Sequence, residues 1–244
     1  MYQQFIYQPI LQTLLWFYQV TGHNLGIAII LLTLLVRGVL IPFTLPQLKS
    51  AKKMASLKPE LDALKKKHGS NPKLFQQKQL EFYKAHGVNP AAGCLPFIAQ
   101  FVVLIALYQV FMHTLGGNGM GDINSTFLLW DLKNKDTTYI LPVLAGLLQL
   151  VTSMALLPAI ENQPEKRPGT KEQKQDVAEM ATSMQQQMVF MMPIMTVIFS
   201  LQFPSGLALY WVITTAFSLT QQLIVSGPGG LLVYLKKIRK LINK

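Results

Sequence analysis

One charged residue, Arg37, lies inside the long apolar stretches of this 244-residue sequence. It stands about eight residues, or roughly 12 Å of helix rise, before the end of the stretch that begins at Leu25. Placing an arginine at the centre of a membrane costs about 3 kcal/mol. The apolar stretches contain no Asp or Glu that could pair with it. Arg37 therefore either extends to the lipid headgroups or faces water inside the protein.

Uncharged polar residues in the middle of these stretches favour the water-facing interpretation. Thr33 precedes Arg37 by four residues and so shares its helix face. Each polar residue alone is typical of a hydrogen bond between packed membrane helices. Together they predict a hydrophilic groove around one unpaired cation. Beside Arg37 and Thr33, the candidates are Gln100, Gln149, Thr152, Trp211, Thr214, Thr215, Ser218, Gln221 and Gln222.

Motifs for covalent chemistry are missing from the sequence. It has no Walker loop, no Gly-rich dinucleotide fingerprint, no His-Glu-x-x-His pair and no Gly-x-Ser-x-Gly elbow. Cys94 is the only cysteine and the four histidines are scattered, which argues against a zinc site or a disulfide scaffold. We expect no cofactor, no metal and no enzyme activity. We expect instead a protein that moves another molecule without covalent catalysis of its own.

The composition is that of a membrane protein. Half of the residues are apolar, only 14% are charged, and the mean hydropathy is +0.31. A soluble domain carries about 25% charged residues. We predict an all-α membrane protein with five transmembrane helices within a core of residues 25–226. The predicted spans are about 25–45, 91–112, 139–159, 187–203 and 205–225, each close to the length that crosses a bilayer. Only Pro204 and its neighbours separate the last two, which predicts a tight helical hairpin.

The distribution of the net charge of +11 predicts the orientation. Residues 44–90 carry ten lysines against three acidic residues, and residues 226–244 carry five basic residues and no acidic one. Both segments lie on the same side of a five-span chain, and basic loops stay in the cytoplasm. We therefore predict an external N-terminus and a cytoplasmic C-terminus.

Residues 1–24 are expected to form an external helix in the membrane interface. Gln4, Gln8 and Gln12 recur at helical spacing among apolar residues. A cleaved signal peptide is the competing interpretation. It is disfavoured because the first 20 residues carry no positive charge.

Residues 47–90 are predicted to form a basic cytoplasmic helical hairpin. Pro46 is expected to close the first span, and residues 47–67 to form a helix with a kink at Pro59. Asn71 is a predicted N-cap with Pro72 at the first helical position, and Gly87 ends the second helix. Two interpretations stay open: a solvated hairpin attracted to lipid, or a docking arm for a nascent chain, a ribosome or anionic lipid.

The tail, residues 227–244, combines an apolar stripe with basic side chains. It is either an interfacial anchor or a contact for the ribosome or for anionic lipid. Its candidate contact residues are Lys236, Lys237, Arg239 and Lys240.

Methionines recur at helical spacing into the fourth span. They form either an ordinary apolar helix face or an adaptable surface along which varied apolar partners slide. The candidate slide residues are Met188, Met191, Met192 and Met195.

Three stretches of the sequence resemble the YidC/Oxa1/Alb3 family of membrane protein insertases. They are Leu25 to Pro46 around Arg37, Gly87 to Pro96 with the following Gln100, and Phe203 to Trp211. Their order on a five-span plan makes the resemblance specific, and it covers about residues 25–222. The chain is similar to the shorter Gram-positive-type members of this family, which have no large periplasmic domain.

The resemblance implies roles for several residues. Arg37 matches the groove arginine, and Thr33, Tyr210 and Trp211 match positions that line the substrate path. It also implies a bacterial plasma membrane protein with nascent membrane proteins as substrates. The ribosome, the Sec translocon and anionic lipids are possible further partners, and DNA is not expected. The chain departs from the family at Ala92, Phe101-Val102 and Thr215, which bears on helix packing more than on function.

Two other functions stay open. A non-inserting assembly factor for membrane proteins would need the same groove. A small-solute transporter with a cationic site usually shows an inverted repeat, and five spans do not divide into equal halves.

Overall fold

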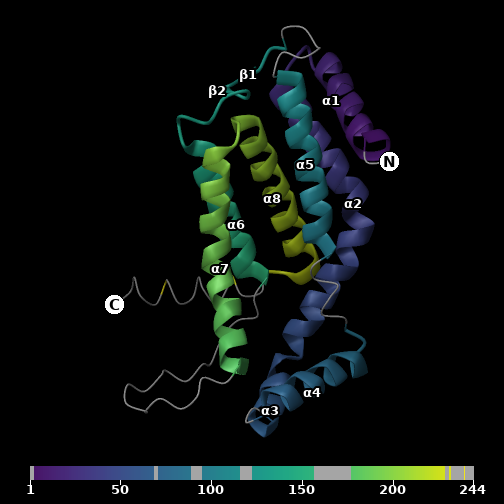
Figure 1. Cartoon of the computed structure of the whole chain (residues 1–244), viewed down its shortest axis with the longest axis vertical. Helices are drawn as coiled ribbons and strands as arrows, with labels where there is room; N and C mark the ends of the chain where they lie inside the picture. The colour runs from purple at the N-terminus through teal and green to yellow at the C-terminus, as the bar shows by residue number, and fades with distance from the viewer. Residues whose placement is uncertain are drawn as a thin grey trace. The chain divides into compact units, whose positions relative to one another are not determined.

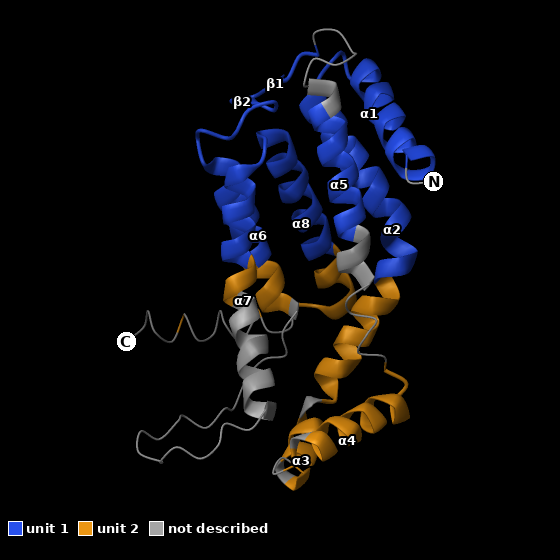
Figure 2. Ribbon diagram, in the orientation of Figure 1, with its two compact units in different colours: residues 1–44, 94–149, 193–220 blue, residues 45–93, 150–192, 221–244 orange. Residues whose placement is uncertain are grey.

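The computed structural model describes residues 3–68, 71–88, 95–115, 123–156 and 177–228, with Leu231 and Arg239. These residues are mostly helical, as predicted (Figure 1). They divide into two compact units (Figure 2). Unit 1 comprises residues 1–44, 94–149 and 193–220, and unit 2 comprises residues 45–93, 150–192 and 221–244.

The N-terminal segment forms a short π-helix, η1 (Gln3–Tyr7), that continues into α1 (Gln8–Val20). Leu11, Leu14 and Tyr18 lie on one face of α1 and are buried in the core of unit 1. The hydroxyl oxygen of Tyr18 accepts a hydrogen bond from the backbone N–H of Asn124 at 2.9 Å. Gln4, Gln8 and Gln12 are exposed, as their spacing predicts.

Among the described residues, two helices are long and apolar enough to cross a membrane, judged by length and composition. They are α2 (Leu25–Ser56) and α8 (Ser205–Ser226). Shorter apolar segments lie within three further helices. These are residues 100–112 of α5 (Leu95–Leu115), 140–155 of α6 (Ile140–Leu156) and 190–202 of α7 (Val177–Gln202). Residues 91–94 and 157–159 of the predicted spans lie outside the described residues.

The prediction of a separate helix over residues 47–67 is wrong at its start, because α2 continues through Pro42 and Pro46 to Ser56. Proline keeps a helical φ and removes one backbone hydrogen bond, so a long apolar helix can continue through it. The interruption falls at Leu57 instead of Pro59. Pro59 is the second residue of α3 (Lys58–His68), where its missing N–H has no partner to lose.

Helices α7 and α8 form the predicted tight hairpin, with α7 ending at Gln202 and α8 beginning at Ser205. A loop whose structure was not predicted from the sequence is hydrogen-bonded to this turn. It contains a two-stranded antiparallel ribbon, β1 (Thr126–Phe127) with β2 (Trp130–Asp131). The Ser205 N–H donates to the carbonyl of Asn134 at 2.7 Å, and the Gly206 N–H to that of Leu132 at 3.1 Å. The first backbone donors of α8 thus find acceptors in the loop.

The core of unit 1 is built from small and branched apolar residues of several helices. Ala28, Ile29, Ala106, Val110 and Ala208 are fully buried. Helices also approach closely at glycine. A Cβ added to Gly146 of α6 would lie 2.3 Å from a side-chain carbon of Val197 on α7. The five buried residues lie on α2, α5 and α8, the helices that also carry Arg37, Gln100 and Thr214.

Within unit 2, α3 and α4 (Pro72–Ala85) form the predicted hairpin. The Asn71 side chain accepts a hydrogen bond from the Leu74 N–H at 3.3 Å, and Pro72 opens the helix. Gly87 follows the helix with φ of 65°. The predictions of an N-cap at Asn71, of Pro72 at the first helical position and of a helix end at Gly87 are confirmed.

Candidate functional site

Arg37 lies on the part of α2 that belongs to unit 1, and its side chain is partly buried. Its Nη2 donates to Gln100 Oε1 at 2.6 Å, and its Nε donates to Thr214 Oγ1 at 3.4 Å. Gln100 Nε2 in turn donates to the hydroxyl oxygen of Tyr210 at 2.8 Å. These four residues, the Arg37 network, join α2, α5 and α8 inside unit 1.

The Arg37 network holds a cation with neutral groups. Among the described residues, an ion pair joins Lys78 to Glu81, and the His86 ring lies 3.7 Å from a Glu60 carboxylate oxygen; both contacts belong to unit 2. Hydrogen bonds to a charged group each contribute about 1.5–3 kcal/mol. Amide and hydroxyl oxygens therefore stabilise the guanidinium without cancelling its charge.

Thr33 does not join the network, although it lies one turn before Arg37. Its hydroxyl donates to the carbonyl of Ile29 at 2.6 Å, and its side chain is only 1% exposed. A threonine in a helix commonly bonds the carbonyl four residues back. Sharing a helix face placed Thr33 near Arg37 but did not decide where its hydroxyl points.

Two other polar candidates of α8, Thr215 and Ser218, bond to their own helix. Thr215 Oγ1 donates to the carbonyl of Trp211, and Ser218 Oγ to that of Thr214, each at 2.9 Å. Trp211 is partly buried. Gln149 in unit 1 and Thr152 in unit 2 both lie on α6, and the Arg37 network includes neither.

The candidates for an apolar slide and for tail contacts are described only in part. Met191 and Met195 of α7 are 59% and 41% exposed, and Met192 is partly buried. The Met188 side chain lies outside the described residues. Of the tail residues, Arg239 is exposed, and Lys236, Lys237 and Lys240 also lie outside the description.

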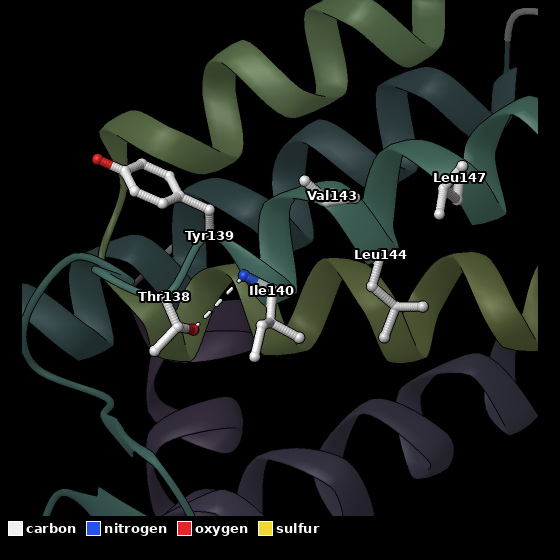
Figure 3. A pocket seen from close by; sticks show the side chains of 6 residues that line it. All are labelled: Thr138, Tyr139, Ile140, Val143, Leu144 and Leu147. Carbon is white, nitrogen blue, oxygen red and sulfur yellow. Dashed lines mark hydrogen bonds between the residues drawn. The ribbon is translucent and has the colours of Figure 1, made fainter.

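A shallow apolar pocket, not predicted from the sequence, lies at the start of α6 (Figure 3). It is lined by Thr138, Tyr139, Ile140, Val143, Leu144 and Leu147. Its lining has no ionisable group besides the Tyr139 phenol. It offers a surface for apolar groups and no charge.

Two carboxylates organise the loop on the turn between α7 and α8. A hydrogen bond from the Ser125 hydroxyl lowers the pKa of Asp131 below its usual value. Burial opposes the ionisation of Asp136. Hydrogen bonds from the Thr138 hydroxyl and from the N–H groups of Thr138 and Leu141 nevertheless hold its pKa below the usual value. Both side chains act as ionised acceptors for loop donors.

A family model described as the 60Kd inner membrane protein matches residues 16–228, which include the whole Arg37 network. The chain belongs to this family.

Named relatives of the family are similar over most of the chain. Membrane protein insertase MisCA of Bacillus subtilis (strain 168) is 32% identical over 93% of this chain and 80% of its own length. Membrane protein insertase YidC 2 of Bacillus anthracis is 35% identical over 93% of this chain and 81% of its own. Membrane protein insertase YidC of Aeromonas salmonicida (strain A449) is 38% identical over 91% of this chain but only 36% of its own length. The match thus covers about four fifths of the two Bacillus relatives and about a third of the Aeromonas relative.

Proposed function

We propose that this chain is a membrane protein insertase that takes nascent membrane proteins as substrates. Two lines of observation support the proposal. The chain belongs to the 60Kd inner membrane protein family, and its relatives are named membrane protein insertases. It also holds a cation at the meeting of three apolar helices with neutral partners.

The observation that carries the proposed mechanism is the charge left on Arg37. In our proposal the Arg37 network lines a hydrophilic groove that is open to the cytoplasm and to lipid. The polar external segment of a substrate enters this groove, attracted by Arg37. Hydrated polar walls lower the barrier for groups whose transfer into hydrocarbon would cost several kcal/mol each.

The apolar helix of the substrate then passes into lipid. Burying it releases roughly 25 cal/mol per Å² of apolar area, which supplies much of the driving force. The exposed Met191 and Met195 of α7 offer flexible apolar contacts along such a path. No nucleotide is needed at this protein.

The proposed topology has five spans in a bacterial plasma membrane, an external N-terminus and a cytoplasmic C-terminus. Residues 1–24 are an external interfacial helix in this proposal, residues 47–90 a cytoplasmic hairpin, and residues 227–244 a cytoplasmic tail. The concentration of lysine in residues 44–90 supports this orientation. The hairpin and tail are proposed contacts for the ribosome, for the Sec translocon or for anionic lipid.

Insertion into liposomes tests the function directly. The purified chain is reconstituted alone and given a small single-span substrate, and the protease-protected fragment is compared with that in empty liposomes. Protection above the empty control supports an autonomous insertase. Protection equal to the control, with correctly oriented protein, contradicts it and favours an assembly factor that acts with a partner.

A further inference from the structure

The two hydrogen bonds of Arg37 use one edge of its guanidinium. Nε–H and Nη2 lie on the same side of the planar group, and these are the atoms that bond Thr214 and Gln100. The protein therefore binds the guanidinium through hydrogen bonds along a single edge.

The adjacent edge, formed by Nη1 and Nη2, keeps its donors. An arginine has five N–H donors, and within the described part of the chain two of them are used. The remaining donors are both hydrogens of Nη1 and one of Nη2. Nη1 and Nη2 together form the fork that a carboxylate accepts in a two-point pair.

Gln100 determines which edge stays available. A guanidinium only donates hydrogen bonds, so the Gln100 amide must present its oxygen to Arg37. Its NH2 group then points the other way, to the Tyr210 oxygen at 2.8 Å. Tyr210 is only 2% exposed, and its ring is fixed in the core of unit 1. The chain of contacts therefore runs from the core through Gln100 to the cation.

The contact between Arg37 and Thr214 is too long to hold the guanidinium in place by itself. Its Nε lies 3.4 Å from Thr214 Oγ1, beyond the usual range for a strong N–H···O bond, whereas the Gln100 contact is 2.6 Å. A long arginine side chain without a firm contact moves its charge towards water. Gln100 is the group that prevents this movement.

We propose that Gln100, anchored by Tyr210, is a positioning residue that holds one edge of Arg37 so that the other edge takes a substrate carboxylate in a two-point pair. The inference rests on the proposed function, since it concerns the same site. It assigns Gln100 and Tyr210 to the orientation of the cation, and Arg37 alone to the contact with the acidic side chain.

Peptide binding tests the inference separately from insertion. The full chain in lipid nanodiscs is titrated with two labelled peptides that differ only by Glu or Gln at one position of a polar segment. For the unchanged protein we expect the Glu peptide to bind about tenfold more tightly. In Gln100→Leu this preference should fall to less than about twofold, and Tyr210→Phe should reduce it partially.

The control is the same substitution elsewhere on the same helix. Gln109 of α5 is exposed and lies outside the Arg37 network, so Gln109→Leu should keep the tenfold preference. Gln100→Met, which keeps the side-chain length, is the second variant if Gln100→Leu does not fold. In an Arg37→Lys background, where no fork exists, the Gln100 substitution should change the preference by less than about twofold.

Several results would overturn the inference. One is a Gln100→Leu protein that keeps the preference. Another is an equal weakening of both peptides, which indicates a structural role only. A third is an unchanged protein that binds both peptides alike. Failure of the unchanged protein to insert a substrate into liposomes contradicts the proposed function instead, while the peptide ratio still decides the role of Gln100.

Discussion

The hydroxyl of Ser205 donates a hydrogen bond to the backbone carbonyl of Asp131 at 2.7 Å. Ser205 is the first residue of α8, and Asp131 is the last residue of the ribbon strand β2. With the N–H bonds of Ser205 and Gly206 to the same loop, this contact fixes the start of the helix that carries Tyr210 and Thr214. The loop thus supports the Arg37 network from a distance.

Replacing Ser205 by alanine should destabilise the protein by about 1 kcal/mol, because the hydrogen bond to the Asp131 carbonyl is lost. Ser205 is only 1% exposed, so water cannot readily take the place of its hydroxyl. The measurement is thermal unfolding in detergent. Thr220→Ala on the same helix is the control, since the exposed Thr220 hydroxyl bonds only the carbonyl of Ala216. Equal midpoints for both variants would contradict the supporting role of the loop.

Replacing Asp136 by alanine should cost about 1–3 kcal/mol at neutral pH, because the N–H groups of Thr138 and Leu141 lose their acceptor. The loss should appear as a lower unfolding midpoint. Asp62 on α3 is exposed, and Asp62→Ala is the matched control that should leave the midpoint nearly unchanged.

The contribution of Asp136 should also depend on pH in a defined direction. Its pKa is lower in the folded protein than the usual value, so its ionised form stabilises the fold above the unfolded pKa of about 4. That contribution is lost as the pH falls through the lowered pKa. Between pH 7 and 5 the difference in midpoint between the unchanged protein and Asp136→Ala should stay constant. Below about pH 4 the difference should shrink. A difference that grows on acidification would contradict this assignment.

Adding a methyl group at Gly146 should loosen the packing of α6 against α7. The new Cβ would lie 2.3 Å from Val197 Cγ2, so Gly146→Ala should cost about 1–3 kcal/mol. Gly38 of α2 has open space around its Cβ position, and Gly38→Ala should be neutral or stabilise by up to about 1 kcal/mol. Unfolding midpoints measure both effects. The double variant Gly146→Ala, Val197→Ala should recover part of the loss, and no recovery would point to another cause.

Replacing Arg37 should separate charge from geometry in the proposed insertase. Arg37→Ala should impair insertion most for substrates with acidic external segments, because the groove then lacks its cation. Arg37→Lys should retain more activity, since it keeps the charge but loses both the edge that bonds Gln100 and Thr214 and the fork of Nη1 and Nη2. The measurement is the protease-protected fraction in liposomes at matched expression. Equal loss in both variants, for acidic and neutral substrates alike, would indicate a structural role for Arg37.

Much of the local structure follows from short stretches of sequence. The Asn71 cap, Pro72 at the first position of α4 and Gly87 after its end need only neighbouring residues. The turn between α7 and α8 around Pro204 is local in the same way. Pro46 shows the limit of such rules: proline disfavours a helix interior by about 3 kcal/mol, yet α2 continues through it.

The sequence by itself determined that a lone cation lies among apolar helices with no acid to pair with it. It did not determine which side chains would hold that cation. Gln100 and Thr214 stand 63 and 177 residues away along the chain, whereas Thr33, on the same helix face, bonds its own backbone. Caps and periodicity act within one or two helical turns, where the chain itself fixes the distances. The partners of Arg37, and the edge of its guanidinium that stays available, depend on how α2, α5 and α8 pack, and only the tertiary structure decides that.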